Sequence, residues 1–161
     1  MKITIRWQKH IQLTRNKELI VDAKKLPDEI QSRPGVYFFS RKYGKSKLPF
    51  YIGETVSIRG RLKNHLASAK IAFVLLGLKT EKVIANRARY FHYGYLKGKA
   101  NKKLMKKRLS IAQRHMIRVA VEGAVPILNS KLTTFKTHAL EFSGGSAARA
   151  IYKKSATVQA S

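Results

Sequence analysis

The stretch from Pro34 to Glu54, PGVYFFSRKYGKSKLPFYIGE, consists of two short apolar runs that flank a basic loop containing a glycine. Successive side chains of a β-strand point to opposite faces of its sheet. One face is predicted to carry Val36, Phe38, Phe50 and Ile52, and the other to carry Tyr37 and Tyr51. We therefore predict a β-hairpin with strands over 35–40 and 49–53. Aromatic residues suit any pleated surface, so the tyrosines alone do not indicate a function.

Size and charge limit the classes of protein that the chain can belong to. Its 161 residues, 44% of them hydrophobic, are enough for one packed domain. The 34 lysines and arginines outnumber the eight acidic residues and give a formal charge of +26. Such an excess repels itself in the folded state unless a polyanion neutralises it. Nucleic acid is the first expected partner, and an anionic membrane surface is the second.

Two absences narrow the chemistry. No run of about 18 uninterrupted apolar residues occurs, and the first residues lack the apolar middle and the cleavage site of a secretion signal. We therefore expect a cytoplasmic protein. Cysteine is absent, which excludes disulfides, thiolate metal sites and cysteine nucleophiles. Any bound metal must use oxygen or imidazole ligands.

Two further strands are predicted from residue patterns outside the hairpin. Alternating Ile3, Ile5 and Trp7 indicate a strand near the start of the chain. The tyrosine-rich residues 89–96 indicate a third core strand, and the apolar residues 70–78 fit either a helix or a strand.

A first helix is predicted over 55–68, where apolar residues such as Ile58 and Leu62 recur at helical spacing. Thr55 and Ser57 are both candidate N-caps. A second, longer helix is predicted over 101–121, with an apolar stripe formed by Met105, Leu109, Ala112, Met116 and Ala120. From Lys97 to Arg118 every charged residue is basic, which favours contact with phosphate over a merely solvated surface.

Arg61 and His65 are the candidate functional residues of the first helix. They lie four residues apart, and therefore on one face, one position away from the apolar stripe. A guanidinium in that position can hold a phosphate with two hydrogen bonds, and an imidazole one turn later can pass a proton. On a basic helix, such a pair alone would more often be an ordinary surface pair.

Together these residues resemble the GIY-YIG nuclease family. Its two triplets are matched by Gly35-Val36-Tyr37 and Tyr51-Ile52-Gly53, and Arg61 and His65 follow the second tyrosine by ten and fourteen residues. The segment from Pro126 to Asn129 also resembles the last element of the family, in which an asparagine closes the site. The resemblance covers about residues 33–130, and its four elements occur in the family's order.

The resemblance implies an α+β fold with a small three-stranded antiparallel sheet flanked by helices. It also implies hydrolysis of a phosphodiester bond with one divalent metal, Mg²⁺ or Mn²⁺. By position, Tyr37 and Tyr51 would line the cleft with one of them near the attacking water, and Arg61 would stabilise charge on the scissile phosphate. His65 would assist Tyr37 or the nucleophile, and Asn129 would fix the arrangement from the far side.

The implied domain organisation has four parts. Residues 1–33 form an N-terminal extension that packs on the core, and 34–130 form the nuclease-like domain. Residues 131–153 extend the same domain, with a possible last helix over 146–153. Residues 154–161 are small and polar and are predicted to be a flexible tail.

One residue departs from the family pattern. The family needs a glutamate on the long helix as its metal ligand, and this sequence has Gln113 at the corresponding position. Magnesium prefers charged oxygen ligands, so a neutral amide should weaken metal binding and cleavage. Three explanations are open. Gln113 is an engineered replacement of a glutamate, or the protein is a natural non-catalytic relative, or Glu122 supplies the metal ligand instead. Glu54 is a further candidate ligand. The intact remainder of the motif favours the first explanation.

The leading interpretation is a metal-dependent DNA endonuclease of low sequence specificity whose catalysis is impaired at Gln113. The alternative is a non-catalytic DNA- or RNA-binding protein on the same fold. DNA, single- or double-stranded, is favoured over RNA as the partner, no membrane contact is expected, and the protein is expected to be a monomer or a weak homodimer. The expected phosphate contacts are Lys45, Lys47, Arg59, Lys63, Lys103, Lys106, Lys107 and Arg114. Residues that could stack on bases are Tyr43, Tyr90, Tyr93 and Tyr95.

Overall fold

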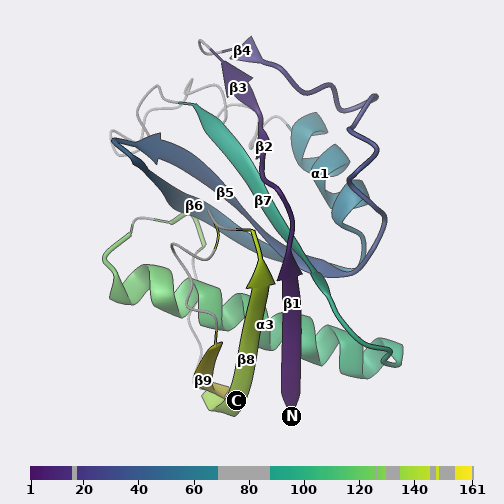
Figure 1. Ribbon diagram of the computed structural model, residues 1–161, viewed down its shortest axis with the longest axis vertical. Coiled ribbons are helices and arrows are strands. Elements are labelled where there is room, and N and C mark those ends of the chain that lie inside the picture. The colour runs from purple at the N-terminus through teal and green to yellow at the C-terminus, as the bar shows by residue number, and fades with distance from the viewer. Residues whose placement is uncertain are drawn as a thin grey trace.

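A large, mostly antiparallel sheet lies between helices α1 (Ile58–Ala67) and α3 (Lys102–Glu122) in the computed structural model (Figure 1). The structure describes residues 1–15, 18–68, 88–125, 127–129, 135–145, 148 and 155–160. The strands are β1 (Lys2–Trp7), β2 (Ile11–Gln12), β3 (Thr14–Arg15), β4 (Glu18–Leu19), β5 (Gly35–Tyr43), β6 (Ser46–Thr55), β7 (Arg89–Leu96), β8 (Phe135–Gly144) and β9 (Ser155–Ala160). The chain is therefore a mixed α+β protein, as the sequence predicts.

The main predicted elements are confirmed. The hairpin is β5 and β6, the third core strand is β7, and the two amphipathic helices are α1 and α3. The Ser57 hydroxyl accepts a hydrogen bond from the Gly60 backbone N–H at 3.2 Å, so Ser57 rather than Thr55 is the N-cap of α1. The Asn101 side chain caps α3 by accepting from the Leu104 N–H at 2.9 Å.

The prediction of a three-stranded sheet is wrong. In the described part of the chain the sheet has seven strands, in the order β6-β5-β7-β1-β8-β9 with β2 also paired to β7. The predicted extension over 1–33 supplies β1, which pairs antiparallel to β7 and parallel to β8. The predicted tail over 154–161 supplies β9, which pairs with β8. β1 covers the backbone N–H and C=O groups that β7 would otherwise leave at an open sheet edge, and β9 does the same for β8.

A β-bulge changes the predicted alternation in the hairpin. Phe39 pairs with Tyr51 and Ser40 pairs with Pro49, so Phe50 is the extra residue on β6. Phe50 consequently points to the same side as Tyr51, and its predicted place beside Ile52 is wrong.

The two faces of the sheet carry separate apolar cores. The face covered by α3, called here the α3 face, buries Ile5, Trp7, Val36, Phe38, Ile52 and Phe142 against the helix. The face covered by α1 and by the segment after β2, called here the α1 face, buries Tyr37, Phe39, Phe50, Phe91, Tyr93 and Tyr95. Tyr37 and Tyr51 share the α1 face, as the alternation predicts.

Some predictions lie outside the described residues. These are the ambiguous segment 70–78, Pro126, and most of the possible helix at 146–153. No helix in the described part of the chain is long and apolar enough to cross a membrane.

Candidate functional site

Tyr37, Tyr51 and His65 form an aromatic cluster on the α1 face. The Tyr37 hydroxyl is hydrogen-bonded to Nε2 of His65 at 2.7 Å, which links β5 to α1. The Tyr51 ring centroid lies 6.3 Å from that of Tyr37 and 5.4 Å from that of His65. Phe39 contacts the imidazole edge to face at 5.3 Å. Tyr37 and His65 are buried and Tyr51 is half-buried, so Tyr51 is the member of the cluster that faces solvent.

Gly53 leaves space for the Tyr37 phenol. The two residues are opposite each other in the β5–β6 ladder. A Cβ at position 53 would collide with Cζ and the hydroxyl oxygen of Tyr37. The glycine of the second triplet therefore lets the phenol lie across β6 and reach His65.

Burial keeps both partners of the Tyr37–His65 hydrogen bond neutral. Burial raises the pKa of the Tyr37 phenol above its usual range, and Tyr51 adds to the increase. Burial, together with the positive charge of Arg61, lowers the pKa of His65 to about 4. At neutral pH the imidazole is therefore unprotonated, and it can accept a proton that the phenol passes on.

Arg61 lies one turn before His65 on α1, and its side chain is exposed. Its charge lowers the pKa values of Tyr37, Glu54 and His65, so the guanidinium is close to all three groups. An exposed guanidinium beside a half-buried phenol is a place where a phosphate can bind.

Gln113 and Asn129 meet at the backbone of Ile52, on the outer edge of the sheet. The Asn129 side chain accepts from the Ile52 N–H at 2.9 Å and donates to the Ile52 carbonyl at 2.7 Å. The Gln113 amide also donates to that carbonyl, at 3.2 Å. Nearby, the Leu128 N–H donates to the Phe50 carbonyl at 2.7 Å. Together these contacts close the edge of β6, much as another strand would.

The structure thus brings the predicted site residues together in two groups. Tyr37, Tyr51, His65 and Arg61 gather on the α1 face. Gln113 and Asn129 gather at the sheet edge, where their amides hold β6. The Asn129 side chain binds the backbone of β6, the strand that carries Tyr51, at Ile52.

In their present orientation, the donor atoms of the Gln113 and Asn129 side chains at the edge of β6 do not suit magnesium. Gln113 turns its Nε2 toward Ile52, and both polar atoms of the Asn129 side chain are used on the same residue. Glu122 is exposed and pairs with Arg118 at 2.6 Å, so the structure places it away from the site. Within the described ranges no three His, Cys, Asp or Glu side chains are grouped to hold a metal.

Glu54 is the carboxylate beside the site. It follows Gly53 on β6 and is half-buried. Burial raises its pKa, and the charges of Arg61 and Lys106 oppose the increase. The Glu54 carboxylate is therefore influenced by the positive charges of two cations from different helices.

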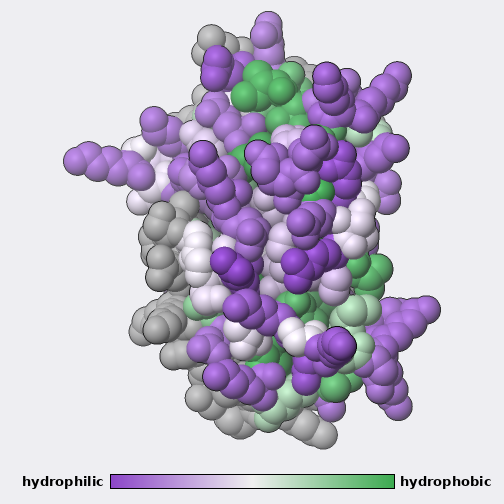
Figure 2. Space-filling view, turned by 45° about the vertical axis from the view of Figure 1, so that its right-hand side comes forward, coloured by the Kyte–Doolittle hydropathy of each residue, from purple (hydrophilic) through white to green (hydrophobic). Residues whose placement is uncertain are grey.

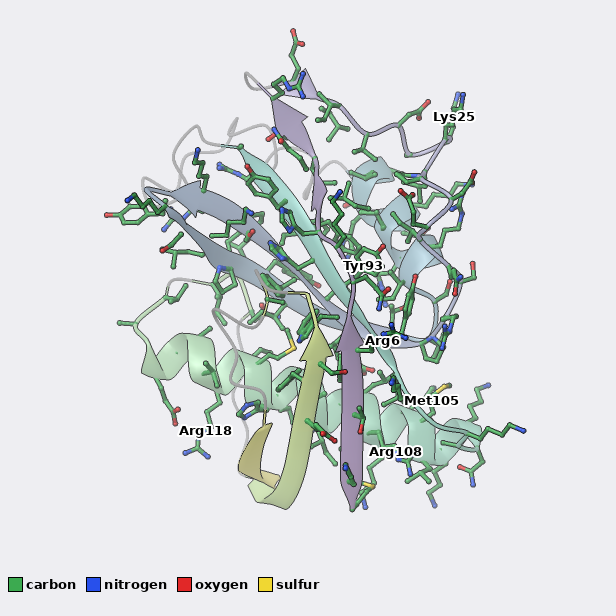
Figure 3. All side chains as sticks on the ribbon, in the orientation of Figure 1. Arg6, Lys25, Tyr93, Met105, Arg108 and Arg118 are labelled. Carbon is green, nitrogen blue, oxygen red and sulfur yellow. The ribbon has the colours of Figure 1, made fainter. Side chains whose placement is uncertain are left out.

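The residues predicted to contact phosphate differ in how exposed they are. Lys45, Lys63, Lys103, Lys106 and Lys107 are exposed. Arg59 is used inside the protein, because its guanidinium donates to the carbonyls of Leu26, Pro27 and Ile30 at 2.8 to 3.1 Å. Lys47 and Arg114 are half-buried. Hydrophilic side chains cover most of the face shown in Figure 2, and Figure 3 labels Arg108 and Arg118 among the basic side chains of α3.

Sequence reasoning missed two contributors to the pocket. The contact of Phe39 with the His65 ring depends on how α1 crosses the sheet. The space that Gly53 leaves depends on the hairpin register, although the glycine directly after Tyr51-Ile52 was a visible signal.

None of the protein-family models, curated proteins or solved structures compared with the chain matches it. The functional argument therefore rests on the residues and geometry described above.

Proposed function

We propose that the protein is a DNA endonuclease of the GIY-YIG type, which hydrolyses phosphodiester bonds with Mg²⁺ or Mn²⁺ and whose activity is weakened by Gln113. The observation that supports this proposal best is the Tyr37–His65 hydrogen bond of 2.7 Å, with Tyr51 and the exposed Arg61 beside it. A phenol, an imidazole and a guanidinium at one opening are the groups needed to hold a phosphate and move a proton.

Each side chain has a defined part in this proposal. Arg61 binds a non-bridging oxygen of the phosphate and stabilises the charge that grows on it. Tyr51, the solvent-facing phenol, orients the attacking water. Tyr37 passes the proton of that water to the neutral Nε2 of His65.

The weak point of the site is position 113. A divalent cation needs charged oxygen ligands, and the Gln113 amide is neutral and turned toward Ile52. We expect the protein as it stands to bind DNA and to cleave it slowly.

The test is Gln113→Glu. We expect cleavage of plasmid DNA with Mg²⁺ or Mn²⁺ to rise by more than about 10- to 100-fold, which is the loss typical of altering even an outer-shell partner of a metal. Gln113→Met is the matched control, because it also removes the hydrogen bond to Ile52 but adds no carboxylate. A purified, folded Glu variant that leaves single- and double-stranded DNA uncut with both metals would refute the endonuclease assignment.

A second candidate function has its own supporting observation. The Gln113 and Asn129 amides share the Ile52 carbonyl, so glutamine at 113 stabilises the edge of β6, which favours a non-catalytic DNA-binding protein. This alternative predicts that Gln113→Glu lowers stability and adds no cleavage. The same experiment therefore separates the two functions.

Both functions require DNA binding that depends strongly on salt. If roughly six to ten phosphates are neutralised, the affinity should fall about 10³- to 10⁵-fold between 50 and 200 mM salt. An affinity that hardly changes over this range would contradict a phosphate-dominated interface.

A further inference from the structure

Two lysines face each other at the tip of the hairpin, far from the pocket. Lys42 of β5 and Lys47 of β6 are direct partners in the antiparallel ladder. Like charges directly opposite each other destabilise a hairpin. The sequence offers no local relief, since no acidic residue occurs between Glu29 and Glu54. Burial and the charge of Lys42 both lower the pKa of Lys47.

A stack of rings places these lysines on the α3 face. Phe38, which belongs to the core under α3, stacks on His92 at 4.2 Å, and His92 stacks on His10 at 5.1 Å. Nε2 of His10 lies 3.0 Å from Nζ of Lys47. An ammonium group can only donate, so this nitrogen of His10 accepts and the imidazole is neutral. The group next to Lys47 therefore does not compensate its charge.

The Tyr37–His65 pocket lies on the other face of the same hairpin. Tyr37 and Lys42 are five residues apart on β5, and an odd spacing puts side chains on opposite faces. Tyr43, the last residue of β5, is six residues from Tyr37 and therefore on the same face as Tyr37, and it is 58% exposed. The end of β5 is at the left in Figure 1. The distance from Tyr37 to Tyr43 along the strand is about 20 Å.

The other tyrosines proposed for base stacking are less accessible. Tyr93, labelled in Figure 3, is 2% exposed and Tyr95 is 5% exposed, so both belong to the core of the α1 face. Tyr90 is half-buried, with the Lys47 ammonium 4.6 Å above its ring. Tyr43 is therefore the best placed of the four to receive a base.

We infer that the hairpin tip is a second DNA contact that selects a single strand, with Lys42 and Lys47 holding a backbone phosphate on the α3 face and Tyr43 stacking a base as the strand passes to the α1 face. The inference rests on the proposed function only in taking DNA as the partner. A single strand can turn around the end of a two-stranded ribbon. Duplex DNA is too stiff to do so, because its persistence length is about 50 nm.

Lys42→Glu tests the phosphate contact, because it should raise the stability of the protein and lower its affinity for single-stranded DNA. It replaces a like-charge pair with an opposite-charge pair, so the urea midpoint of unfolding should rise. The affinity for labelled dT20, measured by fluorescence anisotropy in EDTA, should fall at least about 10-fold more than the affinity for a 20-bp duplex. Lys45→Glu is the matched control: it makes the same charge change in the adjoining turn and should weaken both DNAs by the same factor.

Tyr43→Ala tests the stacking contact. Loss of one base stack should weaken dT20 binding about 5- to 100-fold and leave duplex binding within about 2-fold. Val121→Ala, at another exposed apolar residue, is the control and should change neither affinity. The inference is overturned if Tyr43→Ala leaves dT20 binding unchanged, or if Lys42→Glu and Lys45→Glu weaken both DNAs equally. These assays need no metal and no cleavage, so their outcome is independent of the Gln113→Glu experiment.

Discussion

Strand β5 carries two hydroxyl–imidazole pairs, one on each face of the sheet. On the α1 face Tyr37 is 2.7 Å from Nε2 of His65, and on the α3 face Ser40 is 2.9 Å from Nε2 of His92. In both pairs burial lowers the pKa of the histidine, to about 4 for His65 and to about 2 for His92. By distance and chemistry alone, either pair could be proposed as a proton relay.

The surroundings separate the two pairs. Ser40 and His92 are 0% and 2% exposed, and the Phe38 ring covers the imidazole at 4.2 Å. The Tyr37 pair is beside the half-buried Tyr51 and the exposed Arg61. A hydroxyl–imidazole pair becomes a candidate active site when a phosphate can reach it and a cation is there to bind that phosphate. The Ser40 pair lacks access from solvent and is structural.

Catalysis at the Tyr37 pair should change most. In the Gln113→Glu protein, Arg61→Ala should lower the cleavage rate about 10²- to 10³-fold, because it removes the donor that stabilises charge on the phosphate. Single-turnover cleavage of plasmid DNA measures it. Lys63→Ala, at an exposed cation on the same helix, should change the rate less than about 3-fold. Equal losses for the two variants would mean that Arg61 contributes only general positive charge.

The next effect is on packing around the phenol. Gly53→Ala should lower the free energy of unfolding by about 3 kcal/mol, at the upper end for overpacking, since the new methyl group meets the Tyr37 ring and the ring is held by Phe39 and Phe91. Urea unfolding measures the change. In the Tyr37→Ala background the same substitution should cost little, because the obstructing ring is gone. Additive losses would show that the methyl group meets something else.

A third variant pair compares the two hydroxyls directly. Ser40→Ala should lower the free energy of unfolding by about 1–2 kcal/mol, because it leaves buried Nε2 of His92 without its partner. It should leave cleavage by the Gln113→Glu protein unchanged. Tyr37→Phe removes the other hydroxyl and should abolish most of that cleavage. If Ser40→Ala slowed cleavage as much as Tyr37→Phe, the assignment of the α1 face as the reactive face would be wrong.

The elements around this site follow from local sequence patterns. Three elements could each be predicted from one segment of the sequence, and all three form as predicted. They are the hairpin, from its alternation, the first helix, from the spacing of Ile58 and Leu62, and the long basic helix, from its apolar stripe. The cluster of Tyr37, Tyr51 and His65 was predictable because the two tyrosines share a face and the histidine follows on the next helix.

The features that the sequence did not predict depend on distant segments. The full sheet requires β1 to lie between β7 and β8. Ile5 pairs with Leu96, and Lys2 pairs with Ala139, and no local pattern predicts pairings between such distant residues. The bulge at Phe50 is a property of the strand pair. The use of Arg59 on three backbone carbonyls depends on the path of residues 26–30, and in sequence this arginine looks like any other surface cation.

Acid titration compares the two histidines through the pH dependence of the free energy of unfolding, where the change should be smallest. Both have a lower pKa in the folded protein, to about 4 for His65 and about 2 for His92, than the value of about 6.5 in an unfolded chain. Below pH 6.5 the unfolded chain therefore takes up protons that the folded protein does not, so stability is present above that pH and is lost as the pH falls. Each histidine contributes a slope of up to about 1.4 kcal/mol per pH unit.

His65→Gln should flatten the stability profile between about pH 6 and 4 and leave its slope below pH 4 unchanged, whereas His92→Gln should flatten the profile below pH 4 as well. Urea unfolding at half-unit pH steps measures the slopes, which report bound protons even where a variant is less stable overall. Identical slopes for His65→Gln and the unaltered protein from pH 6 to 4 would show that His65 already titrates normally and is not held neutral beside Tyr37.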